Sequence, residues 1–116
     1  MGFKYDFSFI ERRNEASRVL EKYPDRVPII CDKSRTASND CPDIDKKKYL
    51  VPRNLTMGQF IYIIRKRLKL APEKAIFLFV GNSIAPATSS VDEIYIYNKD
   101  ADGFLYITYT LENVFG

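Results

Sequence analysis

Residues 46–68 read KKKYLVPRNLTMGQFIYIIRKRL, and this stretch determines which fold the rest of the chain can adopt. Its first part, 46–52, predicts a strand that ends at Pro52. Because a proline is tolerated at a strand end or at a sheet edge, but not inside a central strand, an edge position is expected. The second part predicts a helix over 57–68, since Thr56 and Gln59 form a capping-box pattern. Its apolar face consists of Met57, Phe60, Ile61, Ile64 and Leu68.

Further elements are expected on both sides of this stretch. Strands are predicted over 27–32, 75–80 and 104–111 from their apolar and β-branched residues. Ala16, Val19 and Leu20 form an apolar stripe that predicts a helix over 10–23, and Ser90 with Glu93 opens a short helix. Upstream, FKYDFSF is an aromatic-rich arm with at most one helical turn. The two cysteines, Cys31 and Cys41, are expected to be free thiols.

This order predicts an α+β protein of the β-grasp (ubiquitin-like) type, with a mixed four-stranded sheet wrapped on one helix. The helix at 10–23 lies outside that unit and can bury its stripe only on the opposite face of the sheet. With 116 residues, the chain is expected to form a single domain over 1–116. Within it, 1–23 is an N-terminal helical extension and 112–116 a flexible C-terminal tail.

Composition limits the possible functions. The chain has no histidine, which excludes Ser-His-Asp and Cys-His catalysis. The cysteines lack partner ligands spaced for zinc, so no metal or cofactor is expected. A net charge of +3 does not require a nucleic acid partner, although basic runs among aromatics leave a nucleic-acid module as a minor alternative. Because no signal-peptide core precedes the domain, a cytoplasmic protein is expected.

The edge strand is the candidate binding feature. Its alternation places Lys48 and Leu50 on one face and Tyr49 and Val51 on the other. Unpaired backbone groups at a sheet edge can dock an extended peptide, whose side chains then enter a pocket on either side of the edge. Ile63 lies off the main helix stripe and is a candidate pocket wall. Nearby basic residues favour acidic groups beside a bound motif.

Several long stretches together resemble the ubiquitin-like autophagy modifiers of the autophagy-related protein eight family (GABARAP and light-chain-three type). They are KYPDRVP (22–28), DKKKYLVP (45–52), LTMGQFIYIIRKRL (55–68), FLFVGNSIAP (77–86) and FLYITYTLENVFG (104–116). The resemblance implies that Gly116 is joined to phosphatidylethanolamine by activating and conjugating enzymes, and that a cysteine protease processes or deconjugates the product. It implies a protein that is a substrate and a tag rather than an enzyme. Such a protein is cytoplasmic when free and lipid-anchored on the autophagosomal membrane when conjugated. A non-conjugated adaptor, which only docks peptides on vesicle or cytoskeletal proteins, remains the alternative.

The same resemblance implies two pockets for a short motif carried by cargo receptors and adaptors: an aromatic residue, two spacers and an aliphatic residue. The motif would add as a parallel strand beside 46–52. The first pocket comprises Glu15, Val19, Pro28, Ile30, Lys48, Leu50 and Phe104. The second comprises Tyr49, Val51, Pro52, Leu55, Phe60 and Ile63. A basic rim of Arg26, Lys46 and Arg67 would meet the acidic groups of the motif.

Overall fold

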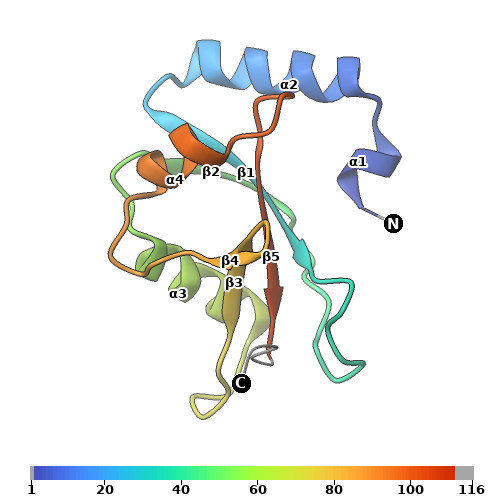
Figure 1. The fold of residues 1–116 in the computed structure, drawn as a ribbon, viewed down its shortest axis with the longest axis vertical. Coiled ribbons are helices and arrows are strands. Elements are labelled where there is room, and N and C mark those ends of the chain that lie inside the picture. The colour runs from blue at the N-terminus through green and yellow to red at the C-terminus, as the bar shows by residue number, and fades with distance from the viewer. Residues whose placement is uncertain (1, 112–116) are drawn as a thin grey trace.

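The computed structural model describes residues 2–111, and Figure 1 shows a sheet with helices on both of its faces. The helices are α1 (Phe3–Asp6), α2 (Phe9–Lys22), α3 (Met57–Leu68) and α4 (Val91–Asn98). The strands are β1 (Arg26–Lys33), β2 (Lys48–Pro52), β3 (Phe77–Val80), β4 (Ser83–Ile84) and β5 (Leu105–Thr110).

The sheet has five strands in the order β2-β1-β5-β3-β4, so the expectation of four strands was wrong. The extra strand is β4, a two-residue segment that pairs with the end of β3. Gly81 makes the turn between them with a φ of 62°, a conformation that favours glycine. The central pair, β1 and β5, is parallel, and the outer pairs are antiparallel, which gives a mixed sheet.

The main core lies between the sheet and α3. Ile29 and Cys31 of β1 and Ile107 of β5 point to this face and are at most 1% exposed. Phe60 and Ile64 of α3 pack in the same cluster and are fully buried. Cys31 and Cys41 are both buried here and form no disulfide, and burial raises the pKa of the Cys31 thiol. The Cys31 thiol is therefore a space-filling residue rather than a reactive group.

A second, smaller cluster covers the opposite face. It joins Phe3 of α1 and Ala16 of α2 to Ile30 of β1 and Phe104. In Figure 1, α2 crosses one end of the sheet, and the C-terminal end of β5 lies at the opposite end. The N-terminal helices thus cover only part of this face.

The helix starts follow the capping patterns. Thr56 and Gln59 form both hydrogen bonds of a capping box, as expected. A second box, from Ser8 and Glu11, begins α2 at Phe9 rather than at residue 10. The helix ends at Lys22, because Tyr23 precedes Pro24 and takes a non-helical conformation.

Candidate functional site

The strand β2 lies at one edge of the sheet and pairs only with β1 among the described strands. It begins at Lys48, whereas the sequence predicted a start at residue 46. The Cys31 amide donates to the Lys47 carbonyl at 2.8 Å, and Ile29 lies opposite Tyr49. Because backbone direction alternates along an antiparallel ladder, Tyr49 and Val51 point their N–H and C=O groups at β1. The backbone groups of Lys48 and Leu50 therefore face away from the sheet.

One side of this edge is flanked by α2, which packs across β1. Lys48 Nζ lies 2.9 Å from Glu15 Oε2 of α2, so an ion pair bridges the two elements. Leu50 of β2 and Val19 of α2 are both half-buried beside it. Four residues predicted for the first pocket, Glu15, Val19, Lys48 and Leu50, therefore come from two elements that an ion pair joins.

Three other residues predicted for the first pocket are deeply buried. Pro28 is buried, and Ile30 and Phe104 are 2% and 3% exposed. Phe3 packs edge-on against Phe104, with ring centroids 5.2 Å apart, and Lys48 Nζ lies 5.4 Å from the centre of the Phe3 ring. The sequence did not point to Phe3, because an aromatic residue in a short arm carries no periodic signal.

The other side of the edge faces α3. Tyr49 packs edge-on against Phe60 with centroids 5.5 Å apart, and its hydroxyl donates to the Lys46 carbonyl at 2.7 Å. Burial raises the pKa of Tyr49 to about 12. Tyr49 and Phe60, both predicted for the second pocket, thus belong to the main core.

The other residues predicted for the second pocket differ in their exposure to solvent. Leu55 and Ile63 are half-buried and pack against the core, which is the position expected of pocket walls. Val51 is 6% exposed, whereas Pro52 is exposed at the end of the strand.

The three residues of the predicted basic rim are spread along the edge. Arg26 lies opposite Pro52, at the far end of β2. Lys46 Nζ lies 5.1 Å from the centre of the Tyr49 ring, and Arg67 Nε pairs with Asp45 at 2.9 Å. Lys46 and Arg67 therefore stand together near the start of β2, and Arg26 stands apart from them.

A buried polar network holds Phe104 in place, and no local pattern in the sequence indicates it. Asp102 is 1% exposed and receives a hydrogen bond from the Phe104 amide at 2.8 Å. Its other oxygen pairs with Arg12 of α2 at 2.6 Å and accepts the Tyr106 hydroxyl at 2.6 Å. Burial and this hydrogen bond raise the pKa of Tyr106. Gly103, with a φ of 96°, brings the turn so close to α2 that a Cβ would lie 3.0 Å from that of Ala16.

Two predictions, the lipid attachment at Gly116 and the flexible tail 112–116, lie outside the described residues. Among the helices of residues 2–111, none is long and apolar enough to cross a membrane.

Comparisons with known proteins agree with this fold. The model of the family "Autophagy protein Atg8 ubiquitin like" matches residues 11–116. Autophagy-related protein 8B of rice (Oryza sativa subsp. indica) is 56% identical over 115 residues, which cover 99% of this chain and 95% of the rice protein. Autophagy-related protein 8 of Schizosaccharomyces pombe is 56% identical over 114 residues, covering 98% and 93%. The crystal structure of Trypanosoma brucei ATG8 superposes with a TM-score of 0.88 at 39% identity, covering 95% of this chain and 93% of that one.

The ubiquitin-like α+β fold with N-terminal helices, together with the family match, places the chain in the class of ubiquitin-like modifiers, which are not enzymes. The chain belongs to the Atg8 family of ubiquitin-like autophagy proteins. It is accordingly a lipid-conjugated modifier of the autophagosome, and its partners include the conjugation machinery of autophagy.

Proposed function

We propose that the chain is conjugated through Gly116 to phosphatidylethanolamine and then recruits cargo receptors by docking their short motifs on the free edge of β2. It is cytoplasmic before conjugation and held on the autophagosomal membrane afterwards. The activating and conjugating enzymes, and a deconjugating or processing cysteine protease, supply all the bond-making chemistry. The chain itself acts as a tag and a binding platform.

The observation that carries the docking proposal is the outward orientation of the Lys48 and Leu50 backbone on an edge strand. An added peptide strand gains its backbone hydrogen bonds from such groups. Both faces of this edge carry half-buried apolar side chains, Leu50 on one and Leu55 with Ile63 on the other. Pro52 has no N–H, so the donors of the edge end at Leu50.

In this arrangement, the aromatic residue of a parallel motif enters the first pocket and the aliphatic residue, three positions on, enters the second. Alternation in a strand would send residues an odd number apart to opposite faces, which matches the aromatic-x-x-aliphatic spacing. Acidic residues before the aromatic one lie near Lys46, Lys48 and Arg67. Arg26 lies at the other end of β2 and would meet groups that follow the motif.

Glycine suits the conjugated position for a steric reason. Without a Cβ, it can enter a narrow active-site channel and adopt dihedral angles that other residues avoid. A lipid attached there converts a diffusing protein into a membrane-anchored one without changing the β2 edge.

Reconstitution tests the conjugation. The purified chain is incubated with the activating and conjugating enzymes of the family, ATP and vesicles that contain phosphatidylethanolamine. We expect a lipidated product from the chain and none from the Gly116→Ala variant. Equal lipidation of both, or no product with enzymes that are active on another family member, would contradict attachment at Gly116. In cells, a pure adaptor would keep its location in the Gly116→Ala variant, and a conjugated modifier would lose it.

A further inference from the structure

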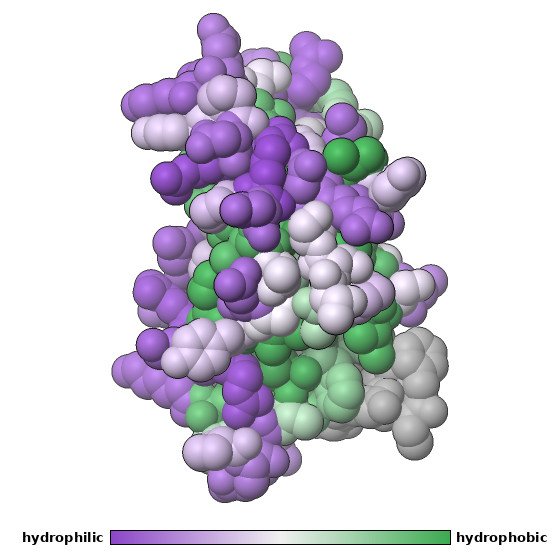
Figure 2. Space-filling model, turned by 90° about the vertical axis from the view of Figure 1, so that its left-hand side faces the viewer, coloured by the Kyte–Doolittle hydropathy of each residue, from purple (hydrophilic) through white to green (hydrophobic). Residues whose placement is uncertain are grey.

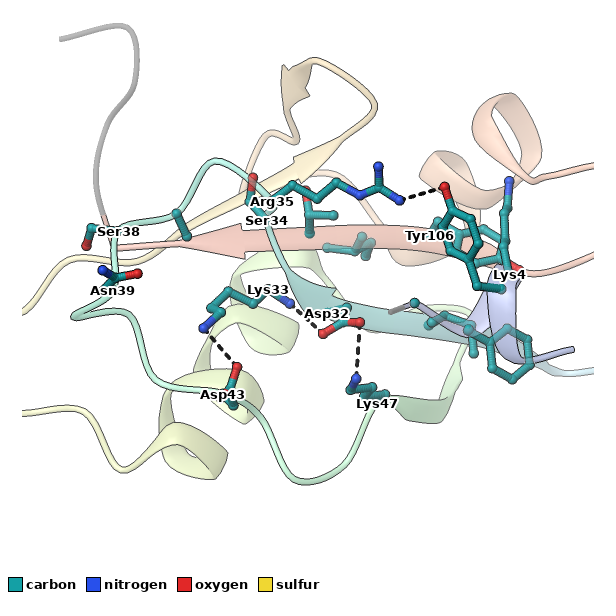
Figure 3. A pocket seen from close by; sticks show the side chains of 17 residues that line it. Lys4, Asp32, Lys33, Ser34, Arg35, Ser38, Asn39, Asp43, Lys47 and Tyr106 are labelled. Atoms are coloured by element: carbon teal, nitrogen blue, oxygen red, sulfur yellow. Dashed lines mark hydrogen bonds and ion pairs between the residues drawn. The ribbon is translucent and has the colours of Figure 1, made fainter.

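A groove of about 1080 Å³ lies on the sheet face that α2 leaves open. Its floor is formed by Ile30 of β1 with Tyr106 and Thr108 of β5, and its walls are α1 and the loop that follows β1. In Figure 3, Arg35 of the loop reaches across the strands toward α1, where it meets the Tyr5 hydroxyl, whereas Lys33 turns toward Asp43. The groove borders the first motif pocket at Ile30 and Phe3, and otherwise extends away from both pockets.

The groove is rich in cations. Lys4, Lys33, Arg35 and Lys47 line it, against two lining carboxylates, Asp32 and Asp43. The lining residues alone carry a formal charge of +2, from four cations and two anions. Asp100, outside the lining, pairs with Lys4 at 2.6 Å, so four cations face three carboxylates and the excess is +1.

The existing ion pairs do not neutralise this surface firmly. Lys33 pairs with Asp43 at 2.8 Å, but the side chain of Asp43 is 89% exposed, and Lys47 meets Asp32 at 3.3 Å (Figure 3). Solvent-exposed pairs of this kind contribute little and exchange readily for another anion. Arg35 donates to the neutral hydroxyl of Tyr5 at 3.0 Å, so this hydrogen bond leaves its charge uncompensated. The groove therefore suits an anion.

The position of the groove relative to the lipid attachment identifies the anion. The Ser34 amide donates to the Tyr109 carbonyl at 2.9 Å, so the cationic loop is joined to β5 two residues before Leu111. Only five residues, 112–116, separate Leu111 from the proposed lipid, and five residues span at most about 18 Å. In Figure 1 the loop after β1 and the end of β5 lie at the same end of the molecule, away from α2. Anchoring at Gly116 thus holds Lys33 and Arg35 close to the headgroup layer.

The acidic flank of a motif peptide fits this groove less well. The β1–β2 ladder ends at Ile30 opposite Lys48, whereas Lys33 lies opposite Tyr109 of β5. The loop cations therefore stand beside a central strand rather than beside the edge that would receive a peptide.

We propose that this groove is the surface through which the anchored protein contacts the anionic, phosphate-bearing headgroups of its membrane. The inference rests on the proposed attachment at Gly116. Contact here fixes the orientation of the anchored protein and keeps the Pro52 end of β2 directed away from the bilayer.

Chemical anchoring tests the inference without the conjugating enzymes. The full chain with Gly116→Cys is coupled to a maleimide-bearing lipid in vesicles of phosphatidylcholine alone or with added phosphatidylserine. Cys31 and Cys41 are buried and do not compete for the reagent. Amide hydrogen exchange of residues 33–37 is then measured by mass spectrometry. We expect slower exchange on the anionic vesicles than on the neutral ones.

Two double variants of the anchored protein distinguish contact through the groove from a general effect of positive charge. Lys33→Gln with Arg35→Gln removes two groove cations, whereas Arg13→Gln with Arg18→Gln removes two exposed cations of α2 at the other end of the molecule. At about fivefold per cation near an anionic surface, the first variant lowers the ratio of docked to undocked protein about 25-fold. The second variant leaves the protection of residues 33–37 intact.

Three results would overturn the inference. Residues 33–37 could exchange equally fast on neutral and anionic vesicles, or both double variants could lose the protection of these residues equally. A soluble acidic motif peptide could also protect residues 33–37 where anionic vesicles do not. Because the anchor is chemical, these results are independent of enzymatic lipidation. Failure of the enzymes to modify Gly116 would contradict the proposed function instead.

Discussion

Arg12 and Asp102 form an ion pair of 2.6 Å in which the Asp102 side chain is fully buried and the Arg12 side chain is 11% exposed. This pair joins α2 to the turn before β5, on the face where the first pocket is proposed. Because the same carboxylate also holds the Phe104 amide, the pair fixes the pocket floor relative to its α2 wall.

Removing the charge of Asp102 should therefore destabilise the protein strongly. Breaking a buried pair by changing one partner costs about 3–5 kcal/mol, since the other charge stays buried and unpaired. We expect Asp102→Asn to lower the free energy of unfolding in urea by about that amount. The Asp45 side chain, which pairs with Arg67, is 72% exposed. Asp45→Asn should therefore lower the free energy of unfolding by about 1 kcal/mol or less. Equal losses would contradict the assigned role of Asp102.

Truncating Leu50 should weaken motif binding with little loss of structure. Leu50 is half-buried at the mouth of the first pocket, so Leu50→Ala removes contact area on the motif's aromatic residue. We expect the dissociation constant of a tryptophan-type motif peptide to rise about tenfold, as for a residue central to an interface. Calorimetry measures this, and circular dichroism verifies the fold. Ile96→Ala, which truncates a side chain that is 57% exposed on α4, is the matched control and should leave affinity unchanged.

Phe104→Ala is a less informative change at the same site. Phe104 is 3% exposed, and truncating a buried phenylalanine typically costs about 3–5 kcal/mol. A loss of peptide binding in this variant counts only if the variant is folded. Unchanged affinity in a folded Phe104→Ala protein would remove Phe104 from the first pocket.

Reversing the charge of Lys48 should affect mainly peptides with acidic flanks. Lys48→Glu breaks the pair with Glu15 and leaves two carboxylates at the pocket mouth. We expect binding of an acidic-flanked peptide to weaken about tenfold at low salt, and the difference to shrink near about 0.5 M salt, where charges are screened within a few ångströms. Lys99→Glu, on an exposed residue outside the site, is the control. A salt-independent effect would mean that Lys48 acts through packing rather than charge.

Stability should fall at alkaline pH. Burial raises the pKa of Tyr49 from its ordinary value of 10.0 to about 12, and it raises the pKa of Tyr109 as well. Above about pH 10 the unfolded chain loses these protons while the folded chain keeps them, so unfolding becomes more favourable as pH rises. The stabilisation is fully present below pH 10 and is lost as the pH rises through the folded-state values. Urea titrations between about pH 9 and 12 measure the slope.

Tyr49→Phe provides the matched comparison for that titration. The variant lacks one of the titrating hydroxyls, so its stability should decline less steeply with pH than that of the unchanged protein. It also loses the hydrogen bond to the Lys46 carbonyl, which lowers its stability at neutral pH. Parallel pH profiles for the two proteins would show that Tyr49 does not contribute to the alkaline loss.

The sequence predicted those parts of the fold that depend on local patterns. The capping box at Thr56 and Gln59 and the proline after Val51 defined α3 and the edge strand correctly. β4 was missed because Ser83 and Ile84 are exposed and too few to show alternation.

Long-range contacts explain the other omissions. The segment NKDADG predicts only a turn, and nothing local shows that Asp102 is buried against Arg12, ninety residues away. Phe3 likewise gains its place through Ile30 and Phe104, which belong to distant segments. The groove beside α1 could not be predicted for the same reason, because its four cations lie far apart in the sequence, between Lys4 and Lys47.

The most direct test of the docking proposal follows the β2 amides by nuclear magnetic resonance. At saturating motif peptide, the Lys48 and Leu50 amides should exchange with solvent much more slowly than in the free protein. The Tyr49 and Val51 amides, already directed at β1, should change little. A peptide with alanine in place of its aromatic and aliphatic residues should have no effect. If the motif peptide binds while Lys48 and Leu50 exchange as fast as before, the free edge of β2 is not the docking site.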